Sequence, residues 1–139
     1  MAMTTHVDIV SAEKEIWTGQ ATMIFAPGEM GELGIAPRHT ALLTRLKAGE
    51  VRVQDEQGNE ESFFITGGIL EIQPNVVTVL SDTAVRADDL DEAQAIAAKE
   101  RAEAHMSDQK SGMDFALAKA ELAEAVAMME TIKKVRSRK

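Results

Sequence analysis

Cysteine is absent from this 139-residue chain, and its absence excludes several kinds of site. Without cysteine the chain has no disulfide framework, no thiolate metal site and no thiol nucleophile. The three histidines, His6, His39 and His105, do not have the spacing of metal ligands, and no serine lies in the context of a nucleophile elbow. The sequence therefore predicts neither a metal centre nor a catalytic nucleophile.

Positive charge and long apolar runs are also scarce. Fifteen Lys and Arg stand against 23 Asp and Glu, a net charge of −8, which is the wrong sign for a surface that binds nucleic-acid phosphates. No stretch approaches the roughly 18 apolar residues of a membrane span, and the first residues lack the basic and apolar regions of a signal peptide. We expect a cytoplasmic protein that binds no nucleic acid and reaches a membrane only through a partner.

Glycine and proline are concentrated in the first part of the chain. Residues 1–86 contain eight of the nine Gly and all three Pro, whereas residues 87–139 contain thirteen Ala, one Gly and no Pro. Gly and Pro mark turns, while Ala is the strongest helix former. The composition therefore predicts a β-rich domain over residues 1–86 and a helical domain over residues 87–139.

Short runs of β-branched and aromatic residues fill the first domain, at 7–10, 22–25, 51–54, 63–66, 69–73 and 76–80. Several alternate between apolar and polar residues, which is typical of antiparallel strands with one face on a core. Gly58-Asn59 and Pro74-Asn75 favour hairpin turns, and Gly67-Gly68 indicates a bulge or a close backbone approach. We predict an antiparallel β-sandwich, or flattened barrel.

The segment 28–34 is rich in glycine and at first resembles a phosphate-binding loop. It lacks the Gly-Lys-Ser/Thr ending, however, and Glu29 and Glu32 would repel phosphate. We expect a shaped loop between strands that exposes Met30 for contact with a protein, with a solvated turn as the alternative.

The second domain has the pattern of two helices. Asp89 and Glu92 form a capping-box arrangement, so the first helix is expected to begin at about Leu90. In the second helix, apolar residues follow a 3-4-3-4 spacing that is typical of an antiparallel helical pair. The predicted fold class is α+β: an antiparallel β-sandwich followed by an antiparallel two-helix hairpin.

Small residues dominate the contact that is expected between the two helices. The expected seam comprises Leu90, Ala93, Ala97, Ala118, Leu122, Ala125 and Met129. Each Ala in place of Leu gives up about three methylene groups, at roughly 0.8 kcal/mol each when buried. A hairpin held so weakly could open when competing contacts are available. The alternative is an ordinary surface hairpin.

Five blocks of sequence, in this order, resemble the epsilon subunit of bacterial F-type ATP synthases. They are Asp-Ile-Val-Ser at 8–11, Gly-Glu-Leu-Gly-Ile at 31–35, Gly-Gly-Ile-Leu-Glu-Ile-Gln-Pro at 67–74, Val-Val-Thr-Val-Leu-Ser-Asp-Thr-Ala at 76–84 and Asp-Leu-Asp-Glu-Ala at 89–93. The resemblance covers nearly the whole chain. It implies a non-catalytic rotor subunit of the central stalk, which helps to couple proton-driven rotation to ATP synthesis at the cytoplasmic face of the bacterial inner membrane.

The resemblance also implies partners for both domains. The sandwich would contact the gamma subunit and the c-ring, and the c-ring contact would comprise Glu29, Met30, Gly31, Glu32, Arg38 and His39. In the family the hairpin is either folded on the sandwich or extended into the catalytic head, where it inhibits ATP hydrolysis. The inhibitory tip would pair with acids on the alpha and beta subunits through Lys133, Lys134, Arg136, Arg138 and Lys139.

Some family members bind ATP on the folded hairpin through an Ile/Leu-Asp-x-x-Arg-Ala motif, from which this chain departs. Here Asp91 is present but Gln94 stands in place of the Arg, and a neutral amide cannot supply the cation that a triphosphate needs. We therefore expect weak ATP binding or none, and no cofactor. An ATP-sensing module is the alternative function, and an unrelated adaptor is a third. Arg38 and Ala41 are further departures, at positions where the family usually has Gly and Pro.

Overall fold

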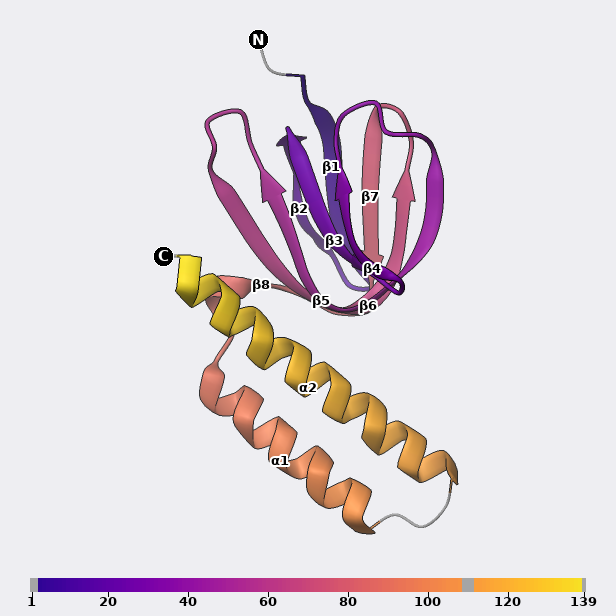
Figure 1. Cartoon of the computed structure of the whole chain (residues 1–139), viewed down its shortest axis with the longest axis vertical. Coiled ribbons are helices and arrows are strands. Elements are labelled where there is room, and N and C mark those ends of the chain that lie inside the picture. The colour runs from indigo at the N-terminus through magenta and orange to yellow at the C-terminus, as the bar shows by residue number, and fades with distance from the viewer. Residues whose placement is uncertain (1–2, 109–111, 139) are drawn as a thin grey trace.

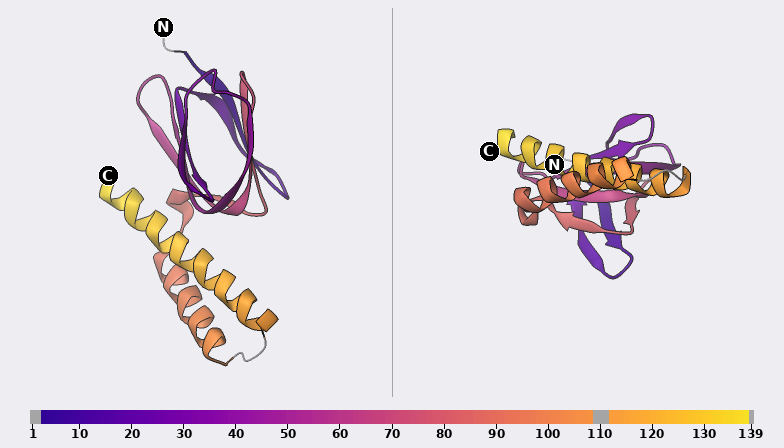
Figure 2. Two further views of the ribbon diagram at one scale, coloured as in Figure 1. Left: turned by 45° about the vertical axis from the view of Figure 1, so that its right-hand side comes forward. Right: turned by 90° about the horizontal axis from the view of Figure 1, so that it is seen from below.

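The computed structural model describes residues 3–108 and 112–138, which form a strand-rich body with a pair of long helices beneath it (Figures 1 and 2). The strands are β1 (Thr5–Ser11), β2 (Glu15–Ala21), β3 (Met23–Gly28), β4 (Gly31–Ile35), β5 (Leu42–Gln54), β6 (Glu60–Ile72), β7 (Val76–Ser81) and β8 (Ala84–Arg86). A short 3₁₀ helix, η1 (Ala87–Asp89), leads into α1 (Glu92–Asp108) and α2 (Gly112–Arg138). The predicted β-sandwich with a following helical hairpin is confirmed.

Two long strands, β5 and β6, connect the layers of the sandwich. Each has 13 residues, and together they form a hairpin in the middle of the strand order β2-β1-β7-β6-β5-β3-β4. The second half of β6 pairs with β7, whereas its first half pairs with β8. The sheet differs from the expected all-antiparallel arrangement at one place, because β1 and β7 are parallel.

The core lies between the two layers and consists of the inward-facing residues of alternating strands. Its largest fully buried members include Ile9, Ile24, Phe63, Ile65 and Leu70. The sequence left open whether Trp17 is a core or an interface residue. In the structure Trp17 is partly buried against this core, with its ring 6.2 Å from that of Phe63.

The turns lie where glycine, proline and asparagine predicted them. In the β5–β6 hairpin, Asp55 Oδ1 accepts hydrogen bonds from the backbone N–H groups of Gln57 and Asn59, both at 2.9 Å. Gly58 has φ +82°, a backbone conformation that favours glycine. Pro74-Asn75 connects β6 to β7 as expected.

The first long helix begins later than the sequence predicted. Residues 87–89 form η1, and α1 starts at Glu92 rather than near Leu90. The N-cap is Asp91 instead of Asp89, because Asp91 Oδ1 accepts hydrogen bonds from the N–H groups of Ala93 at 2.9 Å and Gln94 at 3.4 Å.

Candidate interaction surfaces

The Gly-rich segment forms a tight hairpin between β3 and β4, with Glu29 and Met30 at its turn. Gly28 pairs with Gly31 across the hairpin, and Gly31 has φ +133°. The expected loop is therefore partly a strand, because residues 31–35 form β4. The Met30 side chain is fully exposed, and within the described residues Glu29 and Glu32 form no ion pair. The turn thus presents an apolar tip beside two free carboxylates.

The structure does not place Arg38 and His39 in this turn. They lie in the loop after β4, and β4 alone separates Gly31 from Ile35 by roughly 13 Å at about 3.3 Å per residue. His39 Nδ1 and the carbonyl oxygen of Thr40 are 2.7 Å apart. Arg38 has φ +65°, which is unfavourable for a residue with a Cβ. The residues expected in a single loop therefore lie in two segments of the chain, on either side of β4.

An apolar row, which the sequence pattern did not predict, lies on the outer face of the layer formed by β1, β7, β6 and β5. Val10, Leu80 and Ile69 lie opposite one another on three neighbouring strands, and Ile69 pairs in turn with Arg45. Leu80 and Ile69 are 45% and 43% exposed. Leu43, one row away on the same face, is 68% exposed. We call Val10, Leu43, Ile69 and Leu80 the apolar row.

The seam between α1 and α2 differs from the expected one on the first helix. On α2, Ala118 and Ala125 are buried, and Leu122 and Met129 are half-buried, as expected for seam residues. On α1 the buried residues are Ala95 and Ala102, whereas Ala93 and Ala97 are exposed, so these two assignments are wrong. Leu90 precedes α1 and is half-buried.

The reason for the misplaced seam is that alanine occurs on every side of α1. Residues 93, 95, 97, 98, 102 and 104 are all Ala, so the composition defines no single apolar face. Side-chain contacts near both ends of α1 show the true register. Glu92 pairs with Arg136 at 2.6 Å and His105 lies 3.9 Å from Glu121, which brings Ala102 opposite Ala125.

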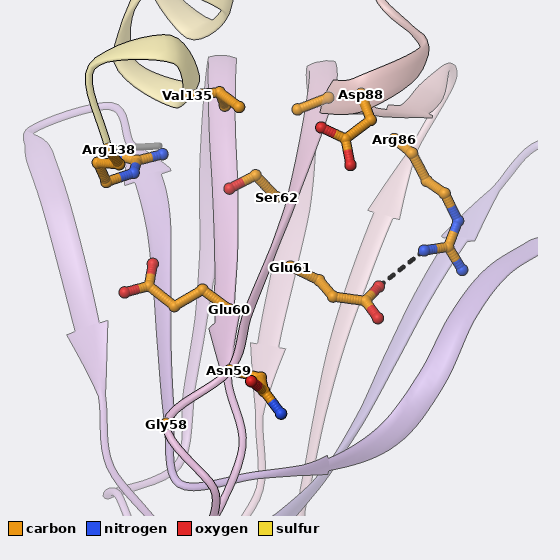
Figure 3. A pocket seen from close by; sticks show the side chains of 10 residues that line it. Gly58, Asn59, Glu60, Glu61, Ser62, Arg86, Asp88, Val135 and Arg138 are labelled. Carbon is orange, nitrogen blue, oxygen red and sulfur yellow. Dashed lines mark hydrogen bonds and ion pairs between the residues drawn. The ribbon is translucent and has the colours of Figure 1, made fainter.

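The C-terminal part of α2 lies against the sandwich. Its residues Ala127, Thr131 and Lys134 line a cleft of 150 Å³ together with Ala48 and other residues of β3 and β5, and with Glu32 of β4. A larger cleft of 510 Å³ lies beyond it, between the end of α2 and the strands β6 and β8. Figure 3 shows Val135 and Arg138 on one side of this cleft and Arg86 on the other, where Arg86 pairs with Glu61 at 2.7 Å.

The basic tail, residues 133–139, forms ion pairs through two of its arginines in this folded state. Arg136 pairs with Glu92 on α1, and Arg138 pairs with Glu50 on β5. Lys133 and Lys134 are exposed and form no ion pair within residues 3–108 and 112–138. Lys139 lies outside the described residues. No sequence pattern indicates either acidic partner, because neither is close to the tail in sequence.

One acid on α2 faces unfavourable surroundings. The pKa of Glu124 is raised above its ordinary value of 4.5, first because partial burial disfavours its charged form and then because Glu121 and Asp82 are negatively charged. Asp82 lies in the turn between β7 and β8. The middle of α2 and the sandwich therefore repel each other through two carboxylates.

The two residues of the ATP motif lie at the start of α1. The Asp91 carboxylate accepts two backbone hydrogen bonds as the helix cap, and the Gln94 side chain is exposed. No group of three or more His, Asp or Glu within the described residues could hold a metal ion. Neither helix of the described chain combines the length and the apolar character that a membrane span needs.

Comparisons with known proteins agree over the whole chain. Residues 4–87 match the model for the "ATP synthase, Delta/Epsilon chain, beta-sandwich domain", and residues 88–133 match that for the "long alpha-helix domain" of the same chain. The chain is 59% identical over 138 residues to the ATP synthase epsilon chain of Nitrosococcus oceani, covering 99% of both chains. It is 58% identical over 137 residues to that of Thioalkalivibrio sulfidiphilus, covering 98% and 97% of the two chains.

Solved structures show the same fold at low sequence identity. A chain in the cryo-EM structure of the Euglena gracilis mitochondrial ATP synthase superposes with a TM-score of 0.79 at 19% identity, covering 95% of this chain and 81% of that one. A chain of the central stalk and c-ring of the Tetrahymena thermophila mitochondrial ATP synthase gives a TM-score of 0.67 at 15% identity, with coverages of 94% and 97%. On the matches of both domains, this chain belongs to the delta/epsilon family of ATP synthase subunits.

Proposed function

We propose that this chain is the rotor subunit that joins the gamma subunit to the c-ring and restrains ATP hydrolysis through its helical hairpin. The family is a non-catalytic stalk component of the ATP synthase, and the solved relatives come from structures of the enzyme with its c-ring. The observation that carries the proposal is a sandwich with exposed apolar side chains on one outer face and at the β3–β4 turn, and with a hairpin packed against one end. The complex would hold the chain at the cytoplasmic face of the bacterial inner membrane.

The apolar row is our candidate for the gamma contact. Its residues are apolar side chains at outward-facing positions of a sheet, where polar residues are the rule. Exposed apolar side chains that lie together on one face are typical of an interaction surface. Arg45, at the edge of the row, would supply a polar rim.

The β3–β4 turn is our candidate for the c-ring contact. The exposed Met30 side chain can insert between partner side chains, while Glu29 and Glu32 attract basic or polar groups on the loops of the c-subunits. Arg38 and His39 lie in the loop after β4, and they would join this contact from a second segment of the chain.

The hairpin is our candidate for the inhibitory element. Its seam consists largely of alanine, and α2 touches the sandwich mainly at β5. Straightened as two helices, the segment 92–138 would span on the order of 70 Å at about 1.5 Å per residue, enough to extend far from the sandwich. In that state Lys133, Lys134, Arg136, Arg138 and Lys139 would be free to pair with acids on the alpha and beta subunits.

A reversible crosslink tests the inhibitory role. The native chain has no cysteine, so Ala48→Cys with Ala127→Cys introduces two thiols that line one cleft between β5 and α2. In the assembled enzyme, a reducible bis-maleimide should hold the hairpin docked and raise ATP hydrolysis, and reduction of the linker should restore inhibition. Each single-cysteine variant serves as a control. Equal hydrolysis before and after crosslinking would contradict the proposal.

Neither Asp91 nor Gln94 of the ATP motif favours the ATP-sensing alternative. Asp91 is occupied as the cap of α1, and Gln94 supplies no positive charge. Calorimetric titration of the isolated chain with millimolar ATP separates the two functions, since heat of binding at the hairpin would favour the alternative.

A further inference from the structure

Two arginines in the last turn of α2 form ion pairs with two other parts of the chain. Arg136 pairs with Glu92 at the start of α1, and Arg138 pairs with Glu50 on β5. Residues two positions apart point in directions about 200° apart around a helix. The end of α2 is therefore held between α1 on one side and the sandwich on the other.

The two ion pairs differ in their exposure to solvent. The side chains of Arg136 and Glu92 are 66% and 46% exposed, so water and salt screen that pair strongly. The Glu50 side chain is only 7% exposed, and that of Arg138 is 33% exposed. Because charges that are shielded from water interact more strongly, the Glu50–Arg138 pair is the stronger restraint.

A neighbouring acid does not compete for Arg138. Glu60 lines the same cleft as Arg138, but it lies 3.1 Å from Nε of Arg52. Phe64, which pairs with Glu50 across the β5–β6 hairpin, is 1% exposed although it lies outside the core cluster of the sandwich. The strand β6, which carries Phe64, contacts both α2 and η1. Docking of α2 therefore covers both an apolar side chain and a carboxylate.

We propose that Glu50 and Arg138 form a latch that holds the hairpin on the sandwich and competes with the partner acids that bind the same arginine in the extended state. The latch rests on the proposed function for its role in the enzyme, although its effect on docking belongs to the isolated chain. Arg138 has one guanidinium, so it cannot serve the latch and an inhibitory contact at the same time. Arg138 thus holds the hairpin on the sandwich in the docked state, and it contributes to the inhibition of ATP hydrolysis in the extended state.

Crosslinking in the isolated, full-length chain tests the latch directly. In the Ala48→Cys, Ala127→Cys background, Glu50→Gln and Arg138→Gln should each lower the ratio of docked to undocked hairpin roughly fivefold, the factor that about 1 kcal/mol produces. The initial rate of crosslinking by a bis-maleimide should fall with the docked fraction. The double variant should lose no more than either single variant, and the swap Glu50→Arg with Arg138→Glu should recover part of the rate. Crosslinking rates that do not change would overturn the latch.

Matched controls separate the latch from a general loss of charge or fold. Lys119→Gln removes one positive charge from α2, and Glu56→Gln removes one acid from the β5–β6 turn; neither residue has an ion pair within the described chain. Both controls should crosslink at the unsubstituted rate. Circular dichroism of each variant reports whether the sandwich is intact.

The assembled enzyme then distinguishes failure of the latch from failure of the proposed function. Glu50→Gln releases the hairpin but keeps Arg138 for the partner, so it should lower ATP hydrolysis by a few-fold. Arg138→Gln removes both contacts and should not inhibit to the same extent. Slower crosslinking with unaltered hydrolysis would support the latch and count against the inhibitory role.

Discussion

Gly68 on β6 lies against the backbone of Leu80 on β7, so closely that a Cβ on Gly68 would be 1.9 Å from the Leu80 carbonyl oxygen. A carbonyl oxygen cannot rotate away as a flexible side chain can. Gly68 also has φ +150°, at the point where β6 passes from one layer of the sandwich to the other. The close approach indicated by Gly67-Gly68 is therefore confirmed, and it connects the two layers.

Replacing Gly68 by Ala should destabilise the sandwich severely. The clash and the backbone strain together should cost about 4 kcal/mol or more, because β6 or β7 must shift. Urea unfolding followed by circular dichroism measures the loss. Gly58→Ala is the matched control, since Gly58 has φ +82° with no atom within 4 Å of the added Cβ, and should cost only about 1 kcal/mol. Similar losses in the two variants would contradict the contact.

Arg38→Gly should stabilise the chain, although it removes a long side chain. Arg38 has φ +65°, where a residue with a Cβ is strained by roughly 1–2 kcal/mol. Glycine relieves this strain but makes the unfolded chain more flexible, so we expect a net gain of about 0.5–1 kcal/mol in urea unfolding. Arg38→Lys keeps the strain and should give no gain. A loss of stability in Arg38→Gly would show that the guanidinium makes a favourable contact.

Glu124 makes docking of the hairpin depend on pH. Burial and the charges of Glu121 and Asp82 raise its pKa in the docked state, and undocking removes the contribution of Asp82 on the sandwich, so that the pKa of Glu124 falls towards its ordinary value of 4.5. Above the raised pKa the carboxylate is charged and opposes docking, and this opposition disappears as the pH falls through the raised pKa towards 4.5. This contribution therefore makes docking tighter in mild acid than at neutral pH.

The variant Glu124→Gln isolates the effect from those of other carboxylates. At pH 7 it should raise the midpoint of thermal unfolding of the helical signal, because the amide carries no charge to bury. The difference between the two proteins should shrink as the pH is lowered and vanish below about 4.5. Glu100→Gln, at an exposed position of α1 without an ion pair in the described chain, should change neither quantity. A difference that grows on acidification would contradict the conclusion that the charged Glu124 carboxylate opposes docking.

The sandwich was predictable where the strand pattern is strong, and less so at its short strands. Alternation and the turn residues located parts of β1, β3, β5, β6 and β7. The strands β2, β4 and β8 were missed. The first two carry glycine, at Gly19 in β2 and at Gly31 and Gly34 in β4, and β8 has only three residues. Such segments lack a pattern of their own, and pairing with a neighbouring strand makes them strands.

The contact surfaces were harder to predict, because they depend on register and on distant pairs. The sequence predicts Leu80 and Ile69 only as strand residues. The pairing of the strands places both on the outer face, beside Val10. Arg138 and Glu50 are 88 positions apart, and no local pattern connects them. The composition of residues 133–139 shows that the tail is basic. Tertiary packing determines which acid forms an ion pair with it.

Ala102 and Ala97 give a direct test of which face of α1 meets α2. Ala102 is 1% exposed and lies opposite Ala125, so Ala102→Leu should force the helices apart and cost about 1–3 kcal/mol. Ala97→Leu adds the same atoms at an exposed position and should change stability by less than about 0.5 kcal/mol. Urea unfolding followed by the helical signal measures both changes. The reverse order, with Ala97→Leu the more damaging, would restore the seam expected from the sequence and overturn the register given by the Glu92–Arg136 pair.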